Sequence, residues 1–191
     1  MFQRQAGSQR PSERDRFVRI LQDAHAGELA AAYAYQAHAK SLRRRPERRE
    51  VEAIEAAEWH HRGLVGEMLT ALEATPRRRR ELLMAFIGRF FGSLCFVTGW
   101  FGPMYAAGRL EAMNVQQYLD ARNLAQVLGY IAYVEQLDAM VAEEDRHEQF
   151  FARHAAGHLL LPIVRFFLKW DPSLTLRKAT SDYPAATDHA I

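Results

Sequence analysis

The 191-residue chain is predicted to be all-α: an antiparallel four-helix bundle with a crossover segment and an additional C-terminal amphipathic helix. Windows rich in alanine, glutamate and leucine repeat their apolar residues at about 3.6-residue spacing. The alternation of Val, Ile and Thr that is typical of strands is nearly absent. The length suits a single hydrophobic core. We therefore assign residues 1–191 to one domain, with the bundle over about 13–157 and the C-terminal helix and tail over 158–191.

The first two bundle helices are expected to form a hairpin. The first begins after Ser12, a typical N-cap residue, and two acidic residues in its first turn favour the helix dipole. It ends at the arginine cluster 43–45. Pro46 is tolerated in a first helical turn, so the second helix begins there and extends to about residues 75–76. A basic run, residues 77–80, follows it.

An uncharged segment, residues 90–108, separates the two hairpins. Its length approaches that of a membrane span, which is about 18–20 residues. However, glycines and Pro103 interrupt it, and Arg89 and Arg109 flank it. We therefore expect a buried crossover or a segment on a membrane surface.

The second hairpin is expected between Pro103 and about Gly157, with its turn near Gly129. A final amphipathic segment, residues 158–170, is rich in Leu, Ile and Phe. The tail from Asp171 contains many Pro, Ser, Thr and Asp residues, so we expect it to be loose.

Composition excludes several classes of protein. The single cysteine, Cys95, excludes an intramolecular disulfide and a cysteine-based zinc finger, and it fits a reducing compartment. A formal net charge of +2 gives no reason to expect nucleic acid as a partner. No phosphate-binding glycine loop or serine-hydrolase motif is present. Residues 1–15 lack the apolar core of a secretory signal, so the expected location is cytoplasmic, either free or peripheral on the inner face of the membrane.

Two Glu-x-x-His motifs carry the chemistry, Glu58 with His61 and Glu144 with His147. Residues three apart on a helix lie on one face, so the carboxylate and the imidazole of each motif can reach one point. Each motif is thus half of a metal site. Two such halves, joined by one glutamate from each of two further helices, form the dimetal carboxylate site of ferritin-like bundles.

Glu28 and Glu111 are the candidates for the two further carboxylates. Glu28 lies among alanines, where a bare carboxylate is costly unless a cation compensates it. Glu28 and Glu58 lie 30 positions apart around the first turn, and Glu111 and Glu144 lie 33 positions apart around the second. Each hairpin therefore brings its single glutamate level with its Glu-x-x-His motif. A tyrosine follows each single glutamate by seven residues.

The predicted metal ligands, which are also the predicted catalytic residues, are Glu28, Glu58, His61, Glu111, Glu144 and His147. The expected supporting residues are His25, Tyr35, Tyr118 and His154. Other acidic residues nearby are expected on solvated helix faces: Glu55, Glu135, Asp138, Glu143 and Glu148. The arginine clusters are interpreted as solvated helix ends.

These motifs resemble those of the demethoxyubiquinone hydroxylases, ferritin-like di-iron enzymes of ubiquinone biosynthesis, over roughly residues 16–157. The segment from His25 to Glu28 resembles the family's first motif. The two Glu-x-x-His segments, the second followed by His154, resemble its second and last motifs, and the glycine-rich residues 91–102 resemble its crossover. The family usually has paired glutamates and a His-His-Tyr run on its third bundle helix, whereas this chain has Glu111 alone and Gln116-Gln117-Tyr118.

The resemblance implies two iron ions, O2 as co-substrate and electrons derived from NAD(P)H. The implied reaction is hydroxylation of a quinone-type ring with a lipid tail. Residues 90–101 and 159–167 would then form the lipid entrance and a surface that faces the membrane. Manganese fits the same oxygen-rich ligands, and homo-oligomerisation is left open. The alternatives are ferritin- or rubrerythrin-like iron oxidation or peroxide reduction, a di-iron hydroxylase of another lipid or of tRNA, and a metal-free scaffold.

Overall fold

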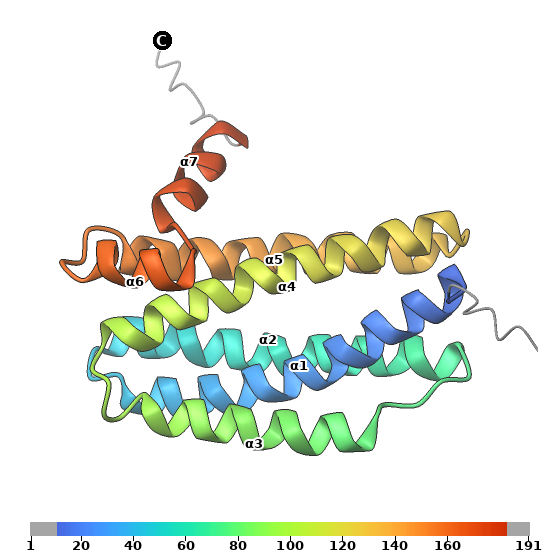
Figure 1. The fold of residues 1–191 in the computed structure, drawn as a ribbon, viewed down its shortest axis with the longest axis horizontal. Helices are drawn as coiled ribbons and strands as arrows, with labels where there is room; N and C mark the ends of the chain where they lie inside the picture. The colour runs from blue at the N-terminus through green and yellow to red at the C-terminus, as the bar shows by residue number, and fades with distance from the viewer. Residues whose placement is uncertain (1–10, 183–191) are drawn as a thin grey trace, which may run out of the picture.

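The computed structural model describes residues 11–182, and over this range the chain forms seven helices and no strand (Figure 1). The helices are α1 Glu13–Ser41, α2 Arg45–Ala71, α3 Arg78–Leu94, α4 Phe101–Val127, α5 Ile131–Ala155, α6 Leu161–Leu168 and α7 Pro172–Asp182. Helices α1 and α2 form one antiparallel hairpin, α4 and α5 form the second, and α1 packs against α4 (Figure 1). The predicted all-α bundle is confirmed.

The predicted helix cap, helix start and turn of the two hairpins are confirmed as well. Ser12 caps α1, because its hydroxyl accepts a hydrogen bond from the Asp15 N–H at 3.1 Å and its own N–H donates to the Asp15 carboxylate at 3.2 Å. Pro46 lies in the first turn of α2. Gly129 closes the turn between α4 and α5 with φ +75°, a conformation in which any other residue would be strained.

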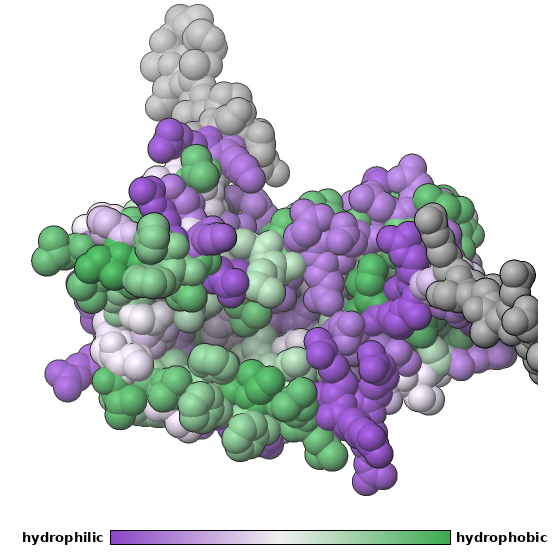
Figure 2. All heavy atoms as spheres, viewed as in Figure 1, coloured by the Kyte–Doolittle hydropathy of each residue, from purple (hydrophilic) through white to green (hydrophobic). Residues whose placement is uncertain are grey.

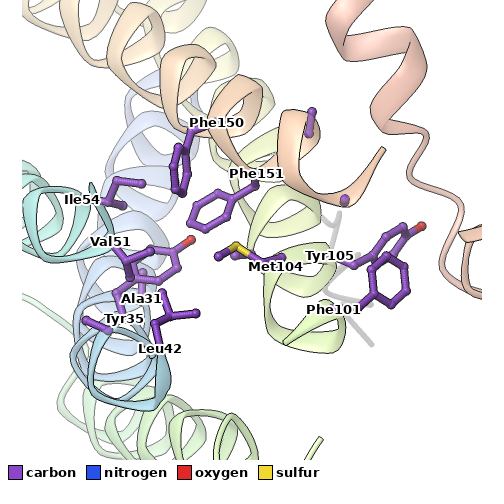
Figure 3. Packing of buried hydrophobic residues seen from close by; sticks show 14 of the residues in the cluster. Ala31, Tyr35, Leu42, Val51, Ile54, Phe101, Met104, Tyr105, Phe150 and Phe151 are labelled. Carbon is purple, nitrogen blue, oxygen red and sulfur yellow. The ribbon is translucent and has the colours of Figure 1, made fainter. Parts of the chain in front are cut away.

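Two apolar clusters fill the bundle, and the predicted ligands lie between them. On α1, for example, Leu21 and Ala24 belong to one cluster and precede Glu28, whereas Ala31 and Tyr35 belong to the other and follow it. Figure 3 shows the second cluster, in which side chains of the first hairpin face those of α4 and α5. The ligands thus form a polar layer between two apolar ones.

Helix α3 was not predicted: the sequence indicates only a basic run over residues 77–80 and an uncharged crossover from residue 90 onward. This helix lies against α1 through Gly88 and Gly92. A Cβ at Gly88 would lie 2.3 Å from the Ala30 carbonyl oxygen, and one at Gly92 would lie 2.8 Å from the Ala37 Cβ. The two glycines therefore permit a close approach that no larger residue allows.

Five large apolar side chains of α3 are exposed, so a buried crossover, one of the two alternatives expected from residue 90 onward, does not describe this helix. A second group of exposed apolar residues lies on and just before α6. Figure 2 shows apolar residues along α3 and at α6, with hydrophilic residues where α3 begins. We refer to these residues together as the apolar face: Leu82, Leu83, Phe86, Phe90, Phe91, Leu159, Leu160, Ile163, Phe166 and Phe167.

Helix α6 ends at Leu168 because Lys169 adopts φ +57°. The chain then turns inward, and the Trp170 side chain packs against α4 at Gly108, where a Cβ would lie 2.0 Å from the indole ring. The Trp170 indole N–H donates to Glu148 at 2.9 Å. Trp170 thus anchors the C-terminal segment to the bundle.

The expectation of a loose tail is wrong for residues 172–182, which form α7 and pack against α5. The Thr175 hydroxyl donates to Glu148 at 2.5 Å. Glu148, expected on a solvated face, therefore connects α5 to the C-terminal segment. The rest of the predicted tail, residues 183–191, lies outside the described residues. Within the described residues, no helix is both long and apolar enough to cross a bilayer.

Candidate metal centre

All six predicted ligands lie in one buried cluster between the two hairpins. Helices α1 and α4 contribute one carboxylate each, and α2 and α5 contribute one carboxylate and one imidazole each. Four of the six residues are fully buried, and the other two, counted over the whole residue, are at most 9% exposed. The members of this metal centre are Glu28, Glu58, His61, Glu111, Glu144 and His147.

The ligand atoms form two overlapping groups, and within each group they all lie within 4.8 Å of one another. The first group is Glu28, Glu58, His61 and Glu144; the second is Glu58, Glu111, Glu144 and His147. Glu58 and Glu144 belong to both groups. A pair of carboxylates shared between two positions is the arrangement that bridges two metal ions in ferritin-like bundles.

Most of these ligand atoms have no hydrogen-bond partner. Both carboxylate oxygens of Glu58 and of Glu144, Oε2 of Glu28, and Nδ1 of His61 and of His147 are buried and make no hydrogen bond, although Nδ1 of His61 lies 2.9 Å from Oε1 of Glu144. Buried polar atoms are nearly always hydrogen-bonded, and leaving one unpaired costs about 1–3 kcal/mol. These atoms converge on one space, where a metal ion could bind them.

The pKa shifts of the four buried glutamates also fit a site for a cation. Burial raises the pKa of Glu28, Glu58 and Glu111, and the negative charge of Glu144 raises each of them further. Burial also opposes ionisation of Glu144, but contacts with His147 and His61 outweigh it and lower the Glu144 pKa. Without metal, protonated glutamates or a positively charged imidazole are therefore favoured in the cluster.

Each single glutamate accepts a hydrogen bond from a tyrosine of the other hairpin. The Tyr35 hydroxyl of α1 donates to Oε1 of Glu111, and the Tyr118 hydroxyl of α4 donates to Oε1 of Glu28. Both tyrosines are buried. The supporting role predicted for them agrees with these contacts, and the exchange between hairpins repeats the internal symmetry of the sequence.

The two predicted supporting histidines contact residues outside the cluster. His25 is buried on α1, with Nδ1 2.8 Å from Glu81 of α3, and Arg62 of α2 pairs with the same carboxylate at 2.6 Å. His154 lies near the end of α5, where its Nδ1 is 2.8 Å from the Phe150 carbonyl oxygen. His25 thus joins three helices one turn before Glu28, and His154 lies two turns beyond His147.

Sequence reasoning missed two residues that contact the ligands. Glu143, expected on a solvated face, lies with Oε2 3.1 Å from Nε2 of His61. The Asn114 side-chain amide donates to Oε2 of Glu111 at 3.3 Å. The only signal for either residue is its position, next to Glu144 and one turn after Glu111, and that position does not say what a side chain contacts.

Carboxylate and imidazole ligands in this number fit divalent iron or manganese. Four carboxylates would supply charge to offset two dications, and the unpartnered atoms are the ones such ions need. No protein-family model matches the chain, and neither does any curated protein. The function must therefore be argued from the centre and its surroundings.

Proposed function

We propose that this protein is a di-iron monooxygenase that hydroxylates a quinone-type lipid ring, using O2 and reducing equivalents derived from NAD(P)H. The observation that supports this most is the pair of overlapping groups of buried, unpartnered ligand atoms. Two iron ions held there would supply the oxygen activation and one-electron chemistry that protein side chains lack. One oxygen atom would enter the ring, and the other would leave as water with two electrons and two protons.

The side chains of the protein would bind and orient the two iron ions. Glu58 and Glu144 would bridge the ions, while Glu28 and His61 would hold one of them and Glu111 and His147 the other. The apolar clusters on both sides of the polar layer would keep bulk water from the reacting atoms.

The apolar face supports a lipid as the substrate. Phe86 is 66% exposed on α3 and Phe166 is 78% exposed on α6, and both lie within the larger set of exposed apolar residues. Contiguous apolar surface of this kind marks a membrane or partner interface in most proteins. The basic run at the start of α3 adds positive charge that attracts anionic lipids. We therefore propose that α3 and α6 lie on a membrane, from which the substrate reaches the centre.

Acidic substitutions on the apolar face test this membrane contact. Phe86→Glu and Phe166→Glu should each weaken co-sedimentation with vesicles of anionic phospholipid by about tenfold or more, because a buried Phe contributes roughly 1.5–3 kcal/mol. Val127→Glu is the matched control, since Val127 is 73% exposed but lies at the end of α4. Equal partitioning of all three variants with the unaltered protein would contradict the membrane contact. Truncation after His158 would test the same contact less specifically, because it would also remove the buried Trp170 that anchors the C-terminal segment.

The reaction itself is tested with iron-loaded protein and vesicles that contain a prenylated methoxyquinone. With NADH and an electron mediator, we expect a product heavier by one oxygen atom, which derives from isotopically labelled O2. The Glu58→Ala variant should form none. If iron is oxidised at the same rate with and without the quinone and no oxygenated product appears, the hydroxylase proposal is wrong.

Iron oxidation is the second candidate function, and one observation favours it. Glu143 contacts His61 yet its side chain is 36% exposed, so a carboxylate leads from solvent to the centre. Iron handling requires such a polar approach. Turnover of many iron equivalents per chain, without any quinone, would support this candidate over the hydroxylase.

A further inference from the structure

The two proposed metal positions have matching ligands, but different neighbouring residues contact and orient those ligands. On the His61 side, Nδ1 lies 2.9 Å from the bridging Glu144, and Nε2 lies 3.1 Å from Glu143. A histidine that binds a metal through one nitrogen usually donates its other N–H to a carboxylate, which fixes the ring and raises its basicity. Glu143 is placed to do this for His61.

Among residues 11–182, no carboxylate gives His147 the same support. Glu143 directly precedes Glu144, and the residue that directly precedes Glu58 in the first hairpin is Ala57, which has no carboxylate. His147 Nδ1 also lies farther from the bridging carboxylates, at 3.7 Å from both Glu58 and Glu144. The His147 side chain is 11% exposed, whereas that of His61 is fully buried.

Glu28 and Glu111 also differ in how many of their carboxylate oxygens accept hydrogen bonds. Glu28 accepts one hydrogen bond, from Tyr118, and its Oε2 is unpartnered and ready for a cation. In Glu111 both oxygens are engaged, one by Tyr35 and the other by Asn114. The residue that corresponds to Asn114 in the first hairpin is Ala31, three positions after Glu28. The Asn114 contact therefore occupies an acceptor site on Glu111 whose counterpart on Glu28 is free.

We infer that the two positions are inequivalent: the position of Glu28 and His61 binds its ion first and more tightly, with Glu143 as its positioning residue. The inference rests on the proposed metal centre. The position of Glu111 and His147, which is held less firmly and whose imidazole is 11% exposed, is then the one at which ligands exchange during turnover.

Titration of the metal-free, full-length protein with Co²⁺ tests the inference, followed by calorimetry and by the visible absorption of the bound ion. We expect two resolved steps. Glu143→Ala should weaken the first step by up to about 100-fold and Glu143→Gln by about 10-fold, since Gln keeps an acceptor oxygen. The second step should remain within about twofold in both. Glu135→Gln removes the same charge from an exposed position of α5 and should change neither step.

A variant with the opposite effect excludes a merely structural explanation. Asn114→Ala should strengthen the second step by about fivefold, because the Asn114 amide no longer competes with the metal ion for that oxygen of Glu111. His147→Ala should retain the tight step, and His61→Ala should retain only the weak one. Two indistinguishable steps, or Glu143 variants that bind like the unaltered protein, would overturn the inference and leave the metal centre standing. If no Co²⁺ binds, the proposed centre fails and the inference fails with it.

Discussion

Replacing Glu58 by alanine should remove both metal ions from the protein, whereas replacing Glu111 should remove one. Glu58 belongs to both groups of ligand atoms and Glu111 to one. Neither change should unfold the bundle. Burial and neighbouring carboxylates raise the pKa of both glutamates, so each side chain destabilises the metal-free protein. Removing this penalty should offset part of the cost of the lost packing and hydrogen bonds, so the metal-free variants should still fold.

Metal content per chain after reconstitution, together with far-ultraviolet circular dichroism, measures this prediction. Glu52→Ala is the matched control, because Glu52 is an exposed residue of the same helix and should leave metal content unchanged. Full occupancy in Glu111→Ala would mean that another residue of α4 is the ligand. Full occupancy in Glu58→Ala would remove the bridging role of that carboxylate.

Metal loading should raise the melting temperature of the protein by about 8–16 °C for each position that is filled. An ion at about 1,000 times its dissociation constant stabilises the folded state by about 4 kcal/mol, and each kcal/mol corresponds to roughly 2–4 °C in a chain of this size. The physical reason is that the unfolded chain cannot bring carboxylates from four helices together. The ions bind only the folded state and remove the repulsion between its buried carboxylates.

Thermal unfolding of metal-free and metal-loaded protein measures this shift, and a chelator should reverse it. The Glu58→Ala variant serves as the control for nonspecific binding and should show almost no shift. A shift of equal size in that variant would place the stabilising ions elsewhere on the chain. The absence of any shift in the unaltered protein would contradict metal binding at the buried centre.

The clustering of the six candidate ligands was predictable because its signal is periodic. Glu-x-x-His places two ligands on one helical face, and the spacing of Glu28 and Glu111 from these motifs brings them level across each hairpin. The structure brings all six side chains together. The seven-residue spacing of Tyr35 and Tyr118 likewise placed both tyrosines near the cluster.

Helix α3 was missed because its pattern is inverted. It buries Gly88 and Gly92 and exposes its phenylalanines, so local hydrophobicity does not reveal which face contacts α1. The basic run at its start was interpreted as a solvated helix end, yet Arg80 Nε lies 2.9 Å from Asp23 Oδ1 of α1. Such pairing between distant segments depends on the tertiary arrangement.

The role of Glu143 was also out of reach of sequence reasoning. It lies about 100° around the helix from Glu144, a direction that a sequence associates with solvent as readily as with a neighbouring helix. Contact with His61 depends on how α2 and α5 are placed against each other. Residues that support ligands from another helix therefore require the structure, whereas ligands that share a helix do not.

A crystal structure of the iron-loaded protein, with anomalous scattering recorded at the iron absorption edge, tests the dimetal centre most directly. We predict two anomalous peaks about 3.5–4 Å apart. Glu58 and Glu144 should lie between them, with His61 beside one peak and His147 beside the other. A single peak, no peak, or peaks outside the four central helices would contradict the centre.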